Sequence, residues 1–253
     1  MTADAARTTT KDPARTPPSA AAGKRAPVSD SDIYERMISA VLDHRLPPGT
    51  KLVEDRLAEA FGVSRTRIRP VLVRLANEQV VTLTPNRGAS IAEPTEQEAR
   101  EVFEVRRLIE PTLVERFVGR ATAADIQTLT RLIRDEDAAR AGGDMHRATR
   151  LSAEFHLRIA EGAGHATLGR VLRELVSRTS LVLMTYSPSH PQARDEANAC
   201  GCQEHQALLG AIKLRDAKEA ARLMRAHLLR LESGLRFETL PGEAPDFVAL
   251  FNR

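Results

Sequence analysis

EDRLAEAFGVSRTRIRPVLVRLANEQVVTLTPNRGASI, residues 54–91, is the stretch that decides the fold of the N-terminal part of the chain. Apolar side chains at Leu57 and Phe61 have the spacing of a short helix with one buried face. Gly62 is expected to end that helix, because glycine readily takes the positive φ angle found after many helices. Ser64 then offers a side-chain oxygen to the free N–H groups of a second helix. The stretch therefore predicts two helices joined by a tight turn.

The second of these helices carries arginine on its exposed side. The predicted buried side consists of Ile68, Val71, Leu72 and Leu75, and the residues at or beside the exposed side are Arg65, Thr66, Arg67, Arg69 and Arg74. No acidic residue lies between Arg65 and Asn77, so the sequence predicts a purely cationic exposed side. Such a helix suits the major groove of DNA. The alternative is a solvated helix that happens to be rich in arginine.

A short hairpin is expected directly after the second helix. Residues 80–83 and 89–91 are β-rich, and Pro85-Asn86-Arg87-Gly88 between them has the composition of a turn. Arg87 would lie at the tip, with Gly88 beside it, where both could touch a neighbouring minor groove or the DNA backbone.

The run from Leu57 to Ile91 resembles the winged helix-turn-helix of the GntR family of bacterial transcription regulators, and LPPGTKLVED before it matches that family's approach to the second helix. The family pattern S-R-T-P-V-R-E-A-L is broken at three positions, Arg67, Pro70 and Val71, which bears on the bases recognised and not on DNA binding as such. Asp55 stands where many relatives carry a basic residue that contacts the DNA backbone.

Helical patterns continue after the predicted hairpin. Aromatic residues make up only 4% of the chain, and strand-rich segments are nearly absent outside residues 80–91. The predicted fold is therefore mainly α, with an N-terminal winged helix-turn-helix followed by an antiparallel α-helical bundle. The expected divisions are a disordered basic tail at 1–29, a DNA-binding domain at 30–92, an all-helical effector-binding and dimerisation domain at 95–236 and a C-terminal tail at 237–253.

Charge and hydropathy restrict the class of protein. Residues 1–28 hold five basic and two acidic residues, and their charge of +3 equals that of the whole chain, so the remainder is neutral. DNA binding is therefore expected from local arginine clustering and not from the overall charge. No apolar run approaches the roughly 20 residues of a membrane helix, and no secretory signal is evident. We expect a cytoplasmic protein without membrane contact.

The second half resembles the effector domain of the FadR-type subfamily of GntR regulators. Three segments carry this resemblance: EVFEVRRLIEP (101–111), LSAEFHLRIAEGAG (151–164) and HQALLGAIKLRDAKEAARLMRAHL (205–228). The resemblance implies a homodimer with an enclosed effector site.

The same resemblance implies a metal site at His156, His205 and His227, where neutral imidazoles would suit Zn²⁺ or Ni²⁺. Ser152 occupies the position where the subfamily usually has a fourth ligand, Asp or Asn. Arg106 matches a subfamily position that could pair with an effector carboxylate. Two alternatives stay open: three core histidines satisfied by hydrogen bonds, and a surface salt bridge between Arg106 and Glu110.

These features favour a DNA-binding transcription regulator, specifically a metabolite-responsive repressor that binds a near-palindromic operator as a homodimer. The effector would be a small carboxylate. The chain has no H-E-x-x-H motif, no nucleophile elbow and no phosphate-binding glycine loop, so no enzymatic activity is expected. The alternatives are a metal-dependent hydrolase-like activity in the helical domain and an effector-independent DNA-binding protein.

Cys200 and Cys202 are the only cysteines, and His205 follows them closely. This spacing invites a metal or redox interpretation. Two reduced thiols in a cytosolic protein are the plainer interpretation.

Overall fold

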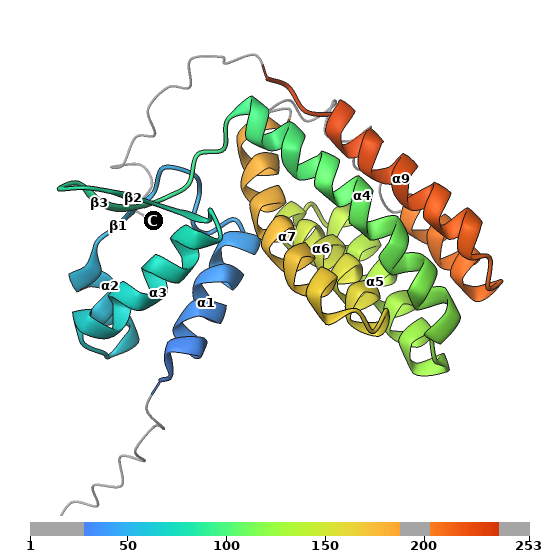
Figure 1. Ribbon diagram of the computed structural model, residues 1–253, viewed down its shortest axis with the longest axis horizontal. Helices are drawn as coiled ribbons and strands as arrows, with labels where there is room; N and C mark the ends of the chain where they lie inside the picture. Colours follow the sequence, from blue (N-terminus) through green and yellow to red (C-terminus); the bar gives the residue numbers. More distant parts are fainter. Residues whose placement is uncertain (1–27, 188–202, 238–253) are drawn as a thin grey trace, which may run out of the picture.

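The computed structural model describes residues 28–187 and 203–237. A winged N-terminal part lies beside a bundle of long helices (Figure 1). The two parts meet where α1 (Asp30–Leu42) of the winged part lies next to α7 (Ala166–Tyr186) of the bundle. This confirms the predicted fold class. Cys200 and Cys202 and most of both predicted tails lie outside the described residues, and the exact domain bounds stay a prediction.

The winged part consists of three helices and a small antiparallel sheet. After α1 come β1 (Lys51–Leu52), α2 (Glu54–Phe61), α3 (Arg65–Asn77), β2 (Val81–Thr84) and β3 (Gly88–Ile91). The predicted hairpin is confirmed as β2 and β3, but the sheet order is β1-β3-β2, so one further strand was not predicted. The missed strand is only two residues long and pairs with Ser90 and Ala89. Two residues cannot show a period in the sequence, and the pairing depends on a distant partner.

Helix ends in the winged part follow the predicted signals with two exceptions. Gly62 ends α2 with φ 66°, as expected. Asp32 and Glu35 have the spacing of a capping box at the start of the first helix. Instead Ser29 is the cap, and Asp32 closes the box by accepting from the Ser29 N–H at 2.8 Å. Ser64 does stand before α3, but its hydroxyl lies 2.8 Å from the Thr66 hydroxyl and makes no capping bond.

The bundle begins with α4 (Glu96–Arg120), followed by α5 (Ala123–Ala141), α6 (Met145–Gly162), α7, a helix at residues 203–213, and α9 (Ala217–Ser233). Thr95 and Thr122 form capping boxes at the starts of α4 and α5. A proline such as Pro111 can kink or divide a helix, but α4 runs through it as one element. Phe117 and Phe155 are fully buried in the bundle core.

The winged part and the bundle share side chains. Leu181 of α7 is buried within the core cluster of the winged part. The Ser180 hydroxyl donates to the Val41 carbonyl of α1 at 3.3 Å, and Arg150 of α6 pairs with Asp43 at 3.2 Å. The end of α1 is therefore held by α6 and α7. Within residues 28–187 and 203–237, no helix is long and apolar enough to span a membrane.

Candidate metal centre and DNA interface

Three histidines from three helices meet inside the bundle. His156 comes from α6, His205 from the helix at 203–213 and His227 from α9, and all three are buried. Their nitrogen atoms lie within 4.8 Å of one another, and the Nε2 atoms of His156 and His227 are 3.2 Å apart. The structure thus brings together all three residues that the resemblance implied.

Each histidine is held by its own glutamate through Nδ1. The Nδ1–H groups of His156, His205 and His227 donate, in that order, to Glu110 at 2.6 Å, Glu136 at 2.9 Å and Glu204 at 2.7 Å. Hydrogen bonds of this kind fix the tautomer and the orientation of a metal-binding imidazole.

Each of these glutamates also pairs with an arginine through its other oxygen. Arg106, Arg140 and Arg230 approach the Oε1 atoms of Glu110, Glu136 and Glu204, each at 2.6 Å. The site is therefore three copies of one unit, arginine–glutamate–histidine. Within each unit the arginine and the glutamate neutralise one another.

Burial favours the neutral imidazole in His156 and His227. It lowers the pKa of His156, although Glu110 opposes the shift, and it lowers the pKa of His227 well below the ordinary value, helped by the neighbouring His205 and His156. Burial alone would raise the pKa of the Glu110 carboxyl, but Arg106 and His156 bring it down to about 2. Neutral imidazole beside ionised carboxylate is the protonation state that metal binding requires.

The arrangement fits a divalent ion. Because the Nδ1–H groups are given to glutamates, the Nε2 atoms of His156 and His227 face each other as lone pairs and cannot bond to one another. Ligands about 2.1 Å from a tetrahedral ion would lie about 3.4 Å apart, close to the observed 3.2 Å. The buried Nε2 of His205 also has no hydrogen-bond partner among the described residues. Three inward lone pairs without a proton are what a cation would satisfy.

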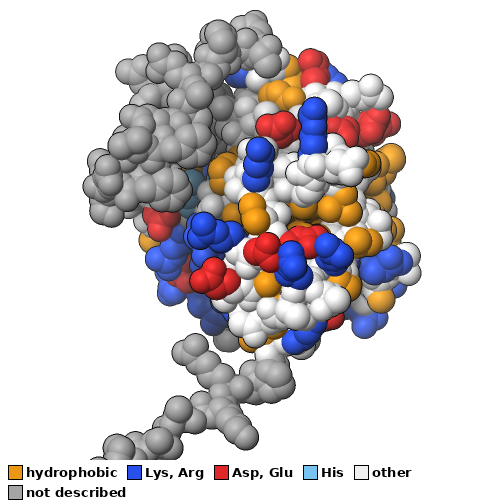
Figure 2. Space-filling model, turned by 90° about the vertical axis from the view of Figure 1, so that its left-hand side faces the viewer, with side chains coloured by type: hydrophobic (Ala, Val, Ile, Leu, Met, Phe, Trp, Pro, Cys, Tyr) orange, Lys and Arg blue, Asp and Glu red, His pale blue; other side chains and the backbone are white. Residues whose placement is uncertain are grey.

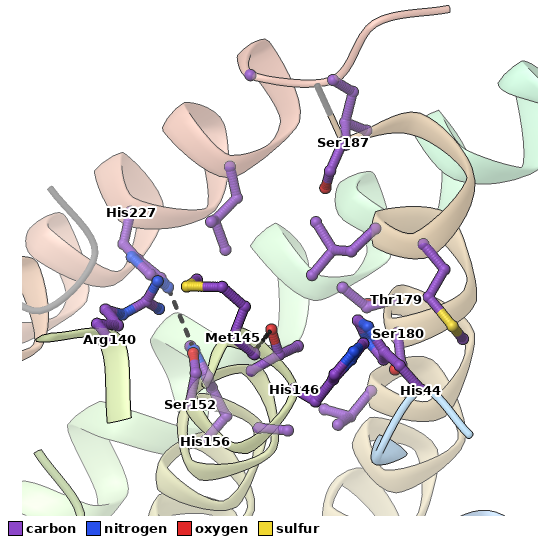
Figure 3. A pocket seen from close by; sticks show the side chains of 18 of the residues that line it. His44, Arg140, Met145, His146, Ser152, His156, Thr179, Ser180, Ser187 and His227 are labelled. Atoms are coloured by element: carbon purple, nitrogen blue, oxygen red, sulfur yellow. Dashed lines mark hydrogen bonds between the residues drawn. The ribbon is translucent and has the colours of Figure 1, made fainter. Parts of the chain in front are cut away.

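A cavity of about 660 Å³ adjoins the histidines. His156, His227 and Arg140 lie at one side of it with Ser152, and His44, His146, Thr179 and Ser180 lie at the other (Figure 3). Ser152 lines the cavity but does not belong to the histidine cluster. Arg106 also lines it.

The Arg106–Glu110 pair weighed at the sequence level exists, but it is buried and not on the surface, with side chains 3% and 2% exposed. Sequence reasoning missed the other two pairs. The i, i+4 spacing of Glu136 and Arg140 was a local signal for one of them. Nothing local joins Glu136 to His205, which are 69 residues apart in the chain.

The expected purely cationic side of α3 is wrong. Four carboxylates reach its arginines from outside the Arg65–Asn77 segment: Arg65 pairs with Asp55 at 3.1 Å, Arg67 with Asp30 at 2.6 Å, Arg69 with Glu54 at 2.9 Å and Arg74 with Glu78 at 3.2 Å. The corresponding face of the molecule accordingly shows basic and acidic side chains side by side (Figure 2). Folding places the ends of α1 and α2 against this helix, which its own composition could not reveal.

Arg74 differs from the other three arginines. Its guanidinium lies 3.5 Å from the ring centroid of Tyr34, whose hydroxyl donates to Glu78 at 2.5 Å. Arg74 therefore packs α3 against α1 whether or not it touches DNA. Thr66 is exposed near the start of α3.

The turn between β2 and β3 presents a single arginine. Arg87 donates its N–H to the Thr84 carbonyl at 3.0 Å, and Asn86 and Gly88 take φ angles of 62° and 86°. Both Arg87 and Gly88 are exposed. Within the described part of the chain, no carboxylate forms an ion pair with Arg87, in contrast to the arginines of α3.

Comparison with known proteins agrees with this architecture. Residues 30–91 match the gntR family of bacterial regulatory proteins, and residues 101–230 match the FCD domain. The chain is a GntR-family transcription regulator with an FCD domain. It is not an enzyme, so the hydrolase alternative is withdrawn. The buried histidine cluster of this regulator corresponds to a metal site typical of FCD domains.

Relatives of this regulator are similar over most of their length. The HTH-type transcriptional repressor GlaR of Escherichia coli K12 is 25% identical over 209 residues, which cover 80% of this chain and 93% of GlaR. The Uxu operon regulator of Haemophilus influenzae is 27% identical over 218 residues, 81% of this chain and 80% of that protein. The structure of E. coli McbR/YncC shares the fold with a TM-score of 0.70 at 22% identity, covering 81% and 97% of the two chains.

Proposed function

We propose that this regulator is a metabolite-responsive repressor that binds a near-palindromic operator as a homodimer, and that a small carboxylate bound at a metal in the bundle controls it. The observation that carries the proposal is the set of three Nε2 lone pairs beside a cavity of about 660 Å³. A cavity of this size accommodates a metabolite.

Charge around the histidines favours an anion. Arg106, Arg140 and Arg230 cancel Glu110, Glu136 and Glu204, so a divalent ion would leave a net charge of about +2. Zn²⁺ or Ni²⁺ suits three imidazoles, and with three protein ligands the ion would offer an open position to a carboxylate oxygen. Arg106 and Ser152 line the cavity where such an anion would lie.

DNA contacts are assigned to two places in the winged part. Arg65, Thr66, Arg67 and Arg69 of α3 would enter the major groove, with Arg74 at the end of the same helix, and Arg87 and Gly88 of the turn would reach the backbone or minor groove. A two-fold dimer would present two such surfaces to related half-sites. We assign this activity to the cytoplasm, where the chromosome of a bacterium lies.

The exposure of apolar side chains bears on the proposed dimer. The apolar side of α7 is buried within this chain, through Leu172, Val176 and Leu181, so it is not a surface for a partner. Leu108 of α4 and Leu229 of α9 are instead 67% and 53% exposed. The names of relatives, GlaR as a transcriptional repressor among them, support repression as the sign of control.

The test pairs metal content with ligand response in the wild type and in Ser152→Asp. Asp at this position supplies an oxygen ligand, so we expect roughly tenfold tighter retention of Zn²⁺ and weaker stabilisation by carboxylates that compete for the same position. Metal is measured by mass spectrometry after dialysis, and ligand binding by the rise in melting temperature. Ser152→Ala is the matched control; because alanine adds no ligand, this variant should retain Zn²⁺ as the wild type does.

Two results would contradict the proposal. One is a purified protein that holds no Zn²⁺, Ni²⁺ or Mn²⁺ after incubation, together with a His227→Ala variant that responds to carboxylates as the wild type does. The other is operator affinity that stays constant across a panel of metabolites, which would favour an effector-independent DNA-binding protein.

A further inference from the structure

The cavity beside the histidines extends to the DNA-binding part of the chain. Besides bundle residues, its lining includes His44, Pro47 and Pro48, which lie between α1 and β1. His44 meets His146 of α6 edge-on, with ring centroids 5.2 Å apart. One wall of the effector cavity is therefore made by the winged part itself.

The two ends of the cavity differ in exposure and chemistry. At one end His156 and His227 are buried; at the other His146 is exposed and His44 half-buried, so this end is the mouth. Met145, Ala153, Val176 and Leu183 add apolar side chains to the lining, and Figure 3 draws Met145 between the two ends. In Figure 3 the histidines of the centre and the His44–His146 pair occupy opposite sides of the opening. The lining thus combines two histidine-bearing ends with apolar side chains.

We propose that the cavity takes an elongated dianion with an aliphatic middle, such as an α,ω-dicarboxylate, and that His44 of the DNA-binding part binds its distal end together with His146. This rests on the proposed function, in which the first carboxylate lies at the metal. The second carboxylate would accept N–H donors from the two imidazoles. The methylenes would lie against the apolar lining between the ends. A shorter acid would fill only the buried end and would leave His44 untouched.

His44 is connected to the recognition helix α3 through α1. It follows α1 directly, with φ 53°, and its N–H donates to the Val41 carbonyl at 2.9 Å. Its neighbour Asp43 is tied to Arg150 of α6. Ile33, Met37 and Val41 of α1 share one buried cluster with Ile68 and Leu72 of α3. A ligand that repositions His44 therefore acts on a helix packed against α3.

Matched acids test the proposal on full-length, Zn²⁺-loaded protein. The probes are succinate, adipate, suberate and sebacate, each beside the monocarboxylate of equal length, with affinity measured by calorimetry. We expect affinity to rise with length among the dicarboxylates, and the best of them to bind about tenfold or more tightly than its monocarboxylate, as for a charged hydrogen bond. In His44→Asn this advantage should disappear while the monocarboxylates bind as before.

Asparagine is chosen because it tolerates the positive φ at this position. Arg45→Ala is the control; it changes the adjacent exposed side chain, which does not line the cavity, and it should keep the preference for dicarboxylates. His146→Gln provides a second variant if His44→Asn fails to fold, and it should also lose the advantage.

The link to DNA is measured on a duplex that the wild type selects from a random-sequence library. The preferred dicarboxylate should weaken duplex binding by the same factor by which the duplex weakens dicarboxylate binding, and His44→Asn should reduce that factor. A dicarboxylate preference that persists in both His44→Asn and His146→Gln would overturn this inference and leave a metal-dependent carboxylate site standing. Failure of all these acids to bind the Zn²⁺-loaded wild type would overturn the carboxylate effector itself.

Discussion

Arginine–carboxylate pairs occur in two regions of this regulator, and one pair from each region, Arg106–Glu110 and Arg65–Asp55, shows how far they can differ in burial. In the bundle, the side chains of Arg106 and Glu110 are 3% and 2% exposed. On the recognition helix, those of Arg65 and Asp55 are 60% and 69% exposed. A buried pair cannot exchange its partner for water or another anion, because an uncompensated buried charge is strongly destabilising. An exposed pair contributes little to stability and can open at little cost.

The same chemical pair thus serves two purposes. In the bundle, Glu110 is fixed by Arg106 and in turn fixes His156, so this pair is part of the frame of the candidate metal centre. On α3, Asp55 and Glu54 hold Arg65 and Arg69 where phosphate or a base edge could replace them. The following predictions test whether this division holds.

The largest effect is expected from Glu110→Gln. It leaves Arg106 as an uncompensated buried charge and removes the carboxylate that holds His156, so the free energy of unfolding should fall by about 3–5 kcal/mol. Urea denaturation of the metal-free protein measures this. The matched control is Glu96→Gln in the same helix, which removes an i, i+4 pair with Arg100 whose side chains are half-exposed; it should change stability by about 1 kcal/mol or less. Equal losses of unfolding free energy in both variants would refute the distinction between buried and exposed pairs.

The second effect is a loss of stability in mild acid. Burial lowers the pKa of His156 and His227, whereas an unfolded histidine titrates near pH 6.5. Below about that pH the unfolded chain takes up protons that the folded chain does not, so unfolding becomes easier, by up to about 1.4 kcal/mol per pH unit for each histidine. Above it, both states are neutral and the contribution vanishes. Urea denaturation of the metal-free protein between pH 7.5 and about 5 measures the change.

Two carboxyls bear on this window. Burial raises the pKa of Glu204, so proton uptake there by the folded state offsets part of the loss. The pKa of Glu110 in the folded protein is about 2. The folded and unfolded states therefore differ in proton binding at Glu110 only below the ordinary pKa of a glutamate, and the stability that its carboxylate contributes is lost in that more acidic range. The double variant His156→Gln/His227→Gln should flatten the profile above pH 5. A profile equally steep in that variant would assign the loss to other groups.

Local signals predicted much of the winged part. Gly62 ends α2 as expected, and the threonine caps of α4 and α5 are signals of the same local kind, because a cap acts within one turn of its own residue. The first cap was misplaced because Ser29 and Asp32 satisfy the same rule as Asp32 and Glu35. The strand β1 was missed because its identity depends on β3.

The site shows a sharper limit. His156, His205 and His227 were found through family resemblance; nothing in their own spacing places three helices around one point. The contacts of Glu136 with His205 and of Asp30 with Arg67 were missed for the same reason, since the two residues of each pair lie 69 and 37 residues apart along the chain. Local sequence predicts helix ends and buried faces, but contacts between helices follow from packing.

The third prediction concerns Arg69, whose ion pair with Glu54 is exposed. Arg69→Ala should weaken operator binding by about 1–3 kcal/mol if the side chain contacts a base. The affinity for a random duplex of the same length is measured in parallel. An equal loss of affinity for that duplex would mean that Arg69 contacts only phosphate. Arg100→Ala, remote from α3, is the control, and stability of Arg69→Ala should stay close to wild type. Unchanged operator affinity would remove Arg69 from the interface.

The smallest effect is expected from Asp55→Asn. Asp55 holds Arg65 at 3.1 Å, on the surface that we assign to DNA. DNA must displace this carboxylate before Arg65 can contact a phosphate, so Asp55 should weaken binding to any sequence. Its replacement should strengthen binding to a random duplex a few-fold, which is the scale of an exposed ion pair.

Salt dependence distinguishes this explanation from a change in folding. If Arg65 gains a phosphate, the plot of log affinity against log salt for the random duplex should steepen by up to about 1. The melting temperature should not change, since the pair is exposed. Affinity for the operator should rise less than affinity for random DNA if Arg65 contacts a base there, because geometry and not free charge limits that contact. Identical salt-dependence slopes for Asp55→Asn and wild type would mean that breaking the Arg65–Asp55 pair has no measurable cost. The exposed pairs would then have no influence on DNA binding.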